Sequence, residues 1–381
     1  MMSVALKMLI GNRASCVGVI FGIFLATLLI SQQSAIFLGL VSRSYRMITD
    51  IPLPNVWVVN PVTESDEKVR VMPEGYLDVV RSIPGIEWAV PINVIDIPLT
   101  TPSGVFQICQ LYGIDDATLI GAPTQMLEGS IRDLRRDGGV IVDIYSAESS
   151  LATTLPDGRK VPLKIGDSFE INNRRAIVVG ICRITQGFYP QPIVFTAFSQ
   201  FKKFTSMNGI GFIAAKTMPG ANIEKILNRI NSYPELNGLT SDQLKWRIAR
   251  SFLKTGILIN FGLSVALGII IGFSIAGQIF YILTLHNLVY YALIKAMGGN
   301  EKLICKMITV QTLLVGAIGY LLGTGATILW GFAIQDTTLA FLFPWQLFVF
   351  TALLVLLICF FTAGLSIRKV FTTDPKMLMG N

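Results

Sequence analysis

Four long apolar runs, at residues 16–41, 251–285, 307–332 and 345–367, constrain the fold of this sequence more than any other feature. The chain is 52% hydrophobic and only 14% charged, whereas soluble domains are usually about 25% charged. A helix of about 20 residues crosses the hydrocarbon core of a bilayer. The sequence therefore predicts an α-helical membrane protein with four transmembrane helices. A domain at residues 42–250 is inserted between the first helix and the second.

The first run follows a basic, amphipathic segment at residues 1–15. A signal peptide would have an apolar region of about 7–15 residues and then a cleavage site of small residues. Here apolar character resumes at Ala35, after the polar residues 31–34, and no clean cleavage motif follows. We therefore expect an uncleaved transmembrane helix, which could continue past Val41 toward Ile48.

The basic residues are placed unevenly along the chain. Residues 42–250 hold 22 Lys and Arg against 21 Asp and Glu, although the whole chain carries a formal charge of +7. The excess lies on short segments beside the apolar runs, at Lys7, Arg13, Lys295, Lys302, Lys306, Arg368, Lys369 and Lys376. Such placement sets membrane topology and does not indicate a nucleic-acid partner. We expect both termini, including the tail 368–381, and the loop 286–306 in the cytoplasm. The domain 42–250 and the short loop 333–344 would lie outside it.

The inserted domain alternates strand and helix patterns. Pro84-Gly85 and residues 102–104 carry turn signals, as does Pro98. Strands are expected at 56–59, 69–72, 86–95, 105–112, 138–142, 163–171, 174–183, 193–196 and 210–215, and helices at 73–83, 146–155 and 222–230. The domain is therefore predicted to be mixed α+β.

The sequence offers no catalytic constellation. None of the five cysteines forms a CxxC motif and there is one histidine, so we expect no metal site. Cys109 and Cys182 are expected as free, buried thiols rather than a disulfide, and Asp115-Asp116 as a solvated turn rather than a cation site. Neither GxSxG nor the Walker A pattern GxxxxGK[ST] occurs. We expect no enzyme activity and no bound cofactor.

Two features of the apolar runs concern helix packing and length. Gly319 and Gly323 form a GxxxG motif, which permits close approach of another helix. After a cap at residues 240–242, the pattern predicts one helix from Asp242 to Leu285. Its 44 residues would span about 66 Å, so roughly half would stand outside the hydrocarbon as a stalk. Trp330 and Trp345 are expected at one membrane interface.

The loop 286–306 carries the main candidate site. On a helix, Leu293, Ala296 and Met297 share one face with Lys295 beside them, and Gly298-Gly299 ends the helix. The residues leave two interpretations open. The helix either lies on lipid headgroups or is a coupling helix that docks in the groove of a soluble partner.

The run Y-A-L-I-K-A-M-G-G at residues 291–299 resembles the R-E-I-A-L-L-K-A-L-G-A segment of the FtsX/MacB-like ABC permeases. The opening segment A-L-K-M-L with Asn12-Arg13 is similar to the family's first helix. The runs at 139–142, 165–167 and 176–181 are similar to its extracytoplasmic domain, the MacB-like periplasmic core. Arg368 with Asp374-Pro375 looks like its closing motif. The amino-acid sequence of residues 291–298, with no fused ATPase, looks most like that of the DevC-type permeases. Val289-Tyr290 stands where the family usually has Arg-Glu.

The resemblance implies an inner-membrane permease subunit of an ABC exporter that works by mechanotransmission. Two copies would pair with two ATP-binding subunits, and an adaptor protein and an outer-membrane channel would complete the route. The residues expected to contact the ATPase are Tyr290, Tyr291, Leu293, Lys295, Ala296, Met297 and Gly298. The substrate class would be a glycolipid, lipid or drug-like molecule. Alternatives within the family are a signalling scaffold that activates an extracytoplasmic enzyme, and a lipoprotein-release permease.

Overall fold

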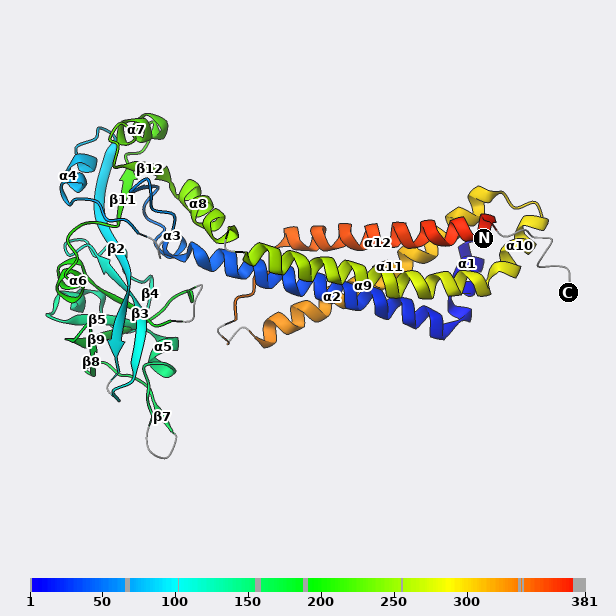
Figure 1. Cartoon of the computed structure of the whole chain (residues 1–381), viewed down its shortest axis with the longest axis horizontal. Coiled ribbons are helices and arrows are strands. Elements are labelled where there is room, and N and C mark those ends of the chain that lie inside the picture. Colours follow the sequence, from blue (N-terminus) through cyan, green and yellow to red (C-terminus); the bar gives the residue numbers. More distant parts are fainter. Residues whose placement is uncertain are drawn as a thin grey trace. The chain divides into compact units, whose positions relative to one another are not determined.

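The structure is a computed structural model of the chain and describes residues 2–65, 69–101, 103–154, 159–187, 191–254, 256–334, 337 and 339–372. The chain divides into two compact units, each described by itself (Figure 1). The helical unit comprises Met1–Leu40 and Gly256–Asn381. The sheet unit comprises Val41–Thr255.

Six helices form the described part of the helical unit: α1 (Met2–Gly11), α2 (Arg13–Ser44), α9 (Ile257–His286), α10 (Leu288–Ala296), α11 (Glu301–Ala333) and α12 (Trp345–Thr372). Four of them are long and apolar enough to cross a membrane, with the spans Arg13–Ser44, Ile257–His286, Glu301–Ala333 and Trp345–Arg368. The four transmembrane helices predicted from the apolar runs are thus confirmed.

The loop 286–306 is more helical than the sequence indicated. α10 fills its first half, and α11 already begins at Glu301 because the Asn300 side chain caps its first turn.

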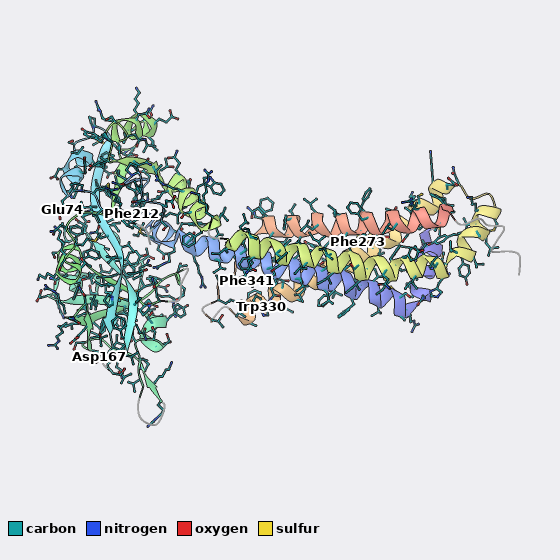
Figure 2. All side chains as sticks on the ribbon, in the orientation of Figure 1. Glu74, Asp167, Phe212, Phe273, Trp330 and Phe341 are labelled. Atoms are coloured by element: carbon teal, nitrogen blue, oxygen red, sulfur yellow. The ribbon has the colours of Figure 1, made fainter. Side chains whose placement is uncertain are left out.

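Near the other end of α11, Trp330 packs edge to face on Phe341, with 5.5 Å between ring centroids (Figure 2). Trp345 begins α12 and is 70% exposed.

The single helix expected from Asp242 to Leu285 is wrong. α8 (Ser241–Leu253) ends before the membrane span, and α9 starts at Ile257. Gly256 lies at φ +83°, a left-handed conformation that interrupts a right-handed helix. The expected cap is present at the start of α8, where Thr240 and Gln243 form a capping box. The single helix expected to span about 66 Å is therefore divided into α8 and α9. On the other connection, α2 continues to Ser44 and α3 (Arg46–Asp50) follows directly.

The sheet unit is mixed α+β, as predicted. Ten of its described strands join one sheet in the order β12-β1-β11-β2-β3-β10-β5-β9-β4, with β8 paired to β2 and β9. The ten are β1 (Val56–Val59), β2 (Ile86–Thr100), β3 (Phe106–Ile114), β4 (Gln125–Gly129), β5 (Gly139–Asp143), β8 (Ser168–Ile171), β9 (Arg174–Arg183), β10 (Ile193–Ala197), β11 (Phe212–Thr217) and β12 (Asn237–Thr240). A separate hairpin pairs β6 (Thr153–Thr154) with β7 (Lys160–Val161).

The long strand β2 connects the two halves of this sheet (Figure 1). Its first half pairs with β11 and its second half with β3. Helices and one 3₁₀ turn pack on the sheet: α4 (Gly75–Arg81), η1 (Ile131–Arg135), α5 (Ile144–Glu148), α6 (Phe198–Thr205) and α7 (Ile223–Ile230). Trp57 and Phe212 lie in the core beneath, fully buried and edge to face.

Several local predictions were wrong. Pro98 does not turn the chain, because it pairs with Ile108 inside β2 and its carbonyl accepts from Asn172. Residues 69–72 make only an isolated bridge, from Met72 to Ile210. The strand expected at 163–171 covers only its last four residues, since Gly166 adopts φ +94° in a turn before it. The helix expected at 146–155 is the shorter α5, capped by Asp143.

Candidate functional site

α10 is a helix with a defined C-terminal stop. The Gly299 amide donates to the Ile294 carbonyl at 2.9 Å and the Gly298 amide to the Lys295 carbonyl at 3.1 Å. This pair of bonds closes a helix when the residue between them is left-handed, and Gly298 has φ +87°. Glycine adopts that conformation without strain, which explains why the helix ends where the sequence indicated.

The residues of α10 divide between two faces. Leu288, Tyr291, Ala292 and Ile294 are buried, with exposures between 2% and 8%. Tyr290, Leu293 and Met297 are 57%, 45% and 77% exposed. Positions three and four apart lie on one side of a helix, so these three side chains form a single outward apolar row. We call Tyr290, Leu293 and Met297 the outer face of α10.

A groove of about 550 Å³ runs between α1 and the outer face of α10. Its lining residues are Lys7, Met8, Gly11, Asn12, Asn287, Tyr290, Leu293, Ile294 and Met297. The lining is mainly apolar, and the exposed Lys7 supplies a cation at one side. Such a groove suits an apolar side chain of a partner together with an acidic group.

Tyr291 points away from this groove and into the core of the unit. Its hydroxyl donates to the side-chain oxygen of Gln311 in α11 at 3.1 Å. The amide nitrogen of Gln311 donates in turn to the Ala5 carbonyl of α1 at 2.7 Å. Burial raises the pKa of Tyr291 to about 12, an effect that the bond to Gln311 opposes. The residue therefore stays protonated at any physiological pH.

The other residues singled out from the sequence lie near this site or in the bundle. Lys295 is paired with Glu301, 3.3 Å away. The side chain of Ala296 lies outside the described residues. Gly319 and Gly323 of α11 face α2: a Cβ at Gly319 would lie 2.8 Å from that of Ile23, and one at Gly323 would lie 2.6 Å from that of Thr27.

The remaining candidates form no site among the described residues. Asp115 accepts from the amide and hydroxyl of Thr118, and Asp116 accepts from Ser199, so both act in turns and caps. Cys109 and Cys182 are free and buried, as expected. In the described part of the chain, no three His, Cys, Asp or Glu side chains are grouped to hold a metal ion. Asp374-Pro375 lies outside that part.

Sequence reasoning missed the α1 side of the groove and the role of Gln311. Met8, Gly11 and Asn12 belong to a segment recognised as amphipathic, but nothing in the sequence placed it beside α10. Gln311 is a polar residue inside an apolar run, and that was the available signal. A buried amide in such a run needs hydrogen-bond partners.

Comparison with known proteins covers almost the whole chain. Residues 15–233 match the model of the MacB-like periplasmic core domain, and residues 251–375 match the FtsX-like permease C-terminal model. No curated protein matches this chain.

Among solved structures, this chain is similar over part of its length to the periplasmic region of MacB from Actinobacillus actinomycetemcomitans. The two are 15% identical with a TM-score of 0.39, over 53% of this chain and 95% of that one. It is also similar to the extracellular domain of the ABC-type transporter YknZ from Gram-positive bacteria. That match is 9% identical with a TM-score of 0.35, over 49% of this chain and 98% of that one.

The MacB-like core model alone spans more than half of the sequence, and the two models together follow the order of the structure: one span, the sheet unit, three spans. Permeases of this kind cross the inner membrane several times and work with ABC ATPase partners. The chain belongs to the family of ABC transporter permeases that combine a MacB-like periplasmic core domain with an FtsX-like permease C-terminal region.

Proposed function

We propose that this chain is the permease subunit of an ABC exporter that works by mechanotransmission. In this proposal, a separate cytoplasmic subunit binds and hydrolyses ATP. When the ATP-binding subunits close on ATP, they move α10 and α1, and the long helices transmit this movement to the sheet unit. The substrate is hydrophobic or amphipathic, in the class of glycolipids, lipids and drug-like molecules.

The outer face of α10 supports this proposal most directly. Three apolar side chains there are 45–77% exposed beside a groove, on a helix whose opposite face is firmly packed. A helix that only covered the bundle would not expose Tyr290, Leu293 and Met297 in one row. Exposed apolar rows of this kind mark contact surfaces. Tyr290 replaces the charged residue that the resemblance led us to expect, so the ATPase contact here is aromatic.

The membrane helices favour movement over a polar pathway. α9 carries no Lys, Arg, Asp or Glu over its 30 residues, and its only titratable side chains are Tyr281 and His286. A transported ion or proton would call for ionisable groups within the spans. In this proposal the termini and α10 lie in the cytoplasm, and two copies form the working dimer. An adaptor protein and an outer-membrane channel receive the substrate outside.

Affinity purification in mild detergent from the native membrane tests the docking step. The variant carrying Leu293→Asp and Met297→Asp places two carboxylates on the outer face of α10. We expect it to lose at least about 90% of the co-purifying ATP-binding subunit, because each buried, unpaired charge costs several kcal/mol. The matched control carries Leu53→Asp and Val62→Asp, two changes at similarly exposed apolar residues of the sheet unit. Equal recovery of the ATP-binding subunit with both variants would refute the proposed contact.

A further inference from the structure

Gln311 occupies an unusual position for an amide side chain. It is 4% exposed on α11, between the buried residues Ile308 and Val315 of the apolar core. An amide buried in apolar surroundings destabilises the fold unless its donors and acceptors are bonded. An apolar residue would serve packing better at this position. The hydrogen bonds of Gln311, rather than its packing, therefore explain an amide at this position.

Those bonds reach two other helices at once. The Ala5 carbonyl can only accept, so the amide nitrogen of Gln311 must face α1. The amide oxygen then faces α10, and the Tyr291 hydroxyl must donate to it. Ala5 is 1% exposed and Tyr291 is 2% exposed, so water does not compete for either bond. One side chain of a membrane helix thus holds α1 and α10 in fixed positions.

We propose that Gln311 is a positioning residue that joins α1 and α10 to α11, so that the two sides of the groove move together as one body. This inference deepens the proposed function, because the groove is the surface offered to the ATP-binding subunit. Without these two hydrogen bonds, each helix could shift separately when the partner pushes on it. With both bonds in place, a push on the outer face of α10 also displaces α1 and α11.

Three substitutions distinguish the loss of these hydrogen bonds from a general loss of stability. Tyr291→Phe removes only the bond to α10. Gln311→Met keeps the length of the side chain and removes both bonds. Thr312→Val is the matched control, because Thr312 is also buried on α11 and its hydroxyl donates within its own helix, to the Ile308 carbonyl at 2.9 Å.

Hydrogen–deuterium exchange of the full chain in nanodiscs measures the effect on each helix. We expect Tyr291→Phe to speed exchange of Leu288–Ala296 about three- to tenfold, the effect of one buried hydrogen bond, and to leave Met2–Gly11 unchanged. Gln311→Met should speed exchange of both segments. Thr312→Val should change neither.

The conservative variant Gln311→Glu distinguishes positioning from packing. A protonated carboxyl can donate to Ala5 and accept from Tyr291, whereas a carboxylate can only accept. Protection of α1 in this variant should therefore match wild type in acid and fall as pH rises, while wild type stays protected after correction for intrinsic exchange.

Two results would overturn the inference: unchanged exchange of α1 in Gln311→Met, or the same loosening of both helices in Thr312→Val. Exchange is measured without the ATP-binding subunit. The exchange pattern could hold while the variant with Leu293→Asp and Met297→Asp still co-purifies that subunit. In that case the proposed docking contact is refuted, and the positioning role of Gln311 is supported.

Discussion

The hydroxyls of Ser31 in α2 and Thr327 in α11 lie 2.6 Å apart, and both residues are fully buried. One turn earlier on each helix Thr27 faces Gly323, and one turn before that Ile23 faces Gly319. The three contacts advance by four residues on both helices. α2 and α11 therefore run parallel and stay in register over two turns, and the two glycines allow the close approach.

Side chains at the two glycines should break this register. We expect Gly319→Val or Gly323→Val to lower the free energy of unfolding by about 1–3 kcal/mol, because the added atoms overlap α2. Gly325→Val is the matched control, since a Cβ there meets no atom within 4 Å. Thermal unfolding in detergent measures the three variants. Equal midpoints for Gly323→Val and Gly325→Val would contradict the packing described here.

Arg46 anchors α3 to the sheet and is 3% exposed. Its guanidinium donates to Gln110, to the Tyr112 hydroxyl at 2.9 Å and to the Thr185 carbonyl at 3.3 Å, and it lies 5.3 Å from the centre of the Tyr112 ring. Arg46→Met removes all of these guanidinium hydrogen bonds from a buried site, so we expect a loss of roughly 3 kcal/mol in unfolding free energy. The exposed Arg250→Met should cost under about 0.5 kcal/mol. Chemical unfolding curves compare the two, and similar values would rule out an anchoring role.

The thiols of the sheet unit should resist modification while the protein is folded. Burial, and then the charge of Asp96, raise the pKa of Cys109 to about 12, and burial likewise raises that of Cys182. A raised pKa keeps the thiol protonated, so its contribution to stability is complete below the ordinary value of about 9 and declines as pH rises toward 12. At pH 8.5, mass spectrometry should find neither residue alkylated by iodoacetamide until denaturant is added. Rapid alkylation of Cys109 or Cys182 in the folded chain would contradict their burial.

The two sides of the membrane can be assigned with single cysteines. Ser103 is exposed in the sheet unit, and Leu293 is 45% exposed on α10. A membrane-impermeant maleimide added to spheroplasts should label Ser103→Cys at once, because the proposed topology puts the sheet unit outside the cytoplasm. Leu293→Cys should react only after the membrane is permeabilised. The reverse order of labelling would show that the topology is opposite to the one proposed.

Features with a local cause were predictable from the sequence. The bounds of β1 and β9 agree with their apolar runs, the cap of α8 lies at Thr240, and α10 ends before Gly298-Gly299. In each case the signal and the structure occupy the same few residues. The apolar runs placed the sheet unit between the first two spans, and the comparisons confirm the family that the sequence resembles.

Features set by distant partners were not predictable. β12 is a four-residue strand with the turn-like sequence N-G-L-T, and it forms only because β1 lies beside it. Gln311 bonds Ala5 across 306 residues of sequence, a pairing that no local pattern reveals. Apolar periodicity suggested one helix through residues 242–285, whereas α8 ends at Leu253 and Gly256 adopts a left-handed conformation before α9.

Site-specific photocrosslinking tests the central claim, that the outer face of α10 receives an ATP-binding subunit. A photoreactive phenylalanine analogue would replace Leu293 in cells of the native host, with Val62 of the sheet unit replaced as the control position. We predict that illumination joins the chain to an ATP-binding protein from position 293 and not from position 62. Crosslinks from position 293 to lipid alone would contradict the account and would make α10 a helix lying on the membrane surface.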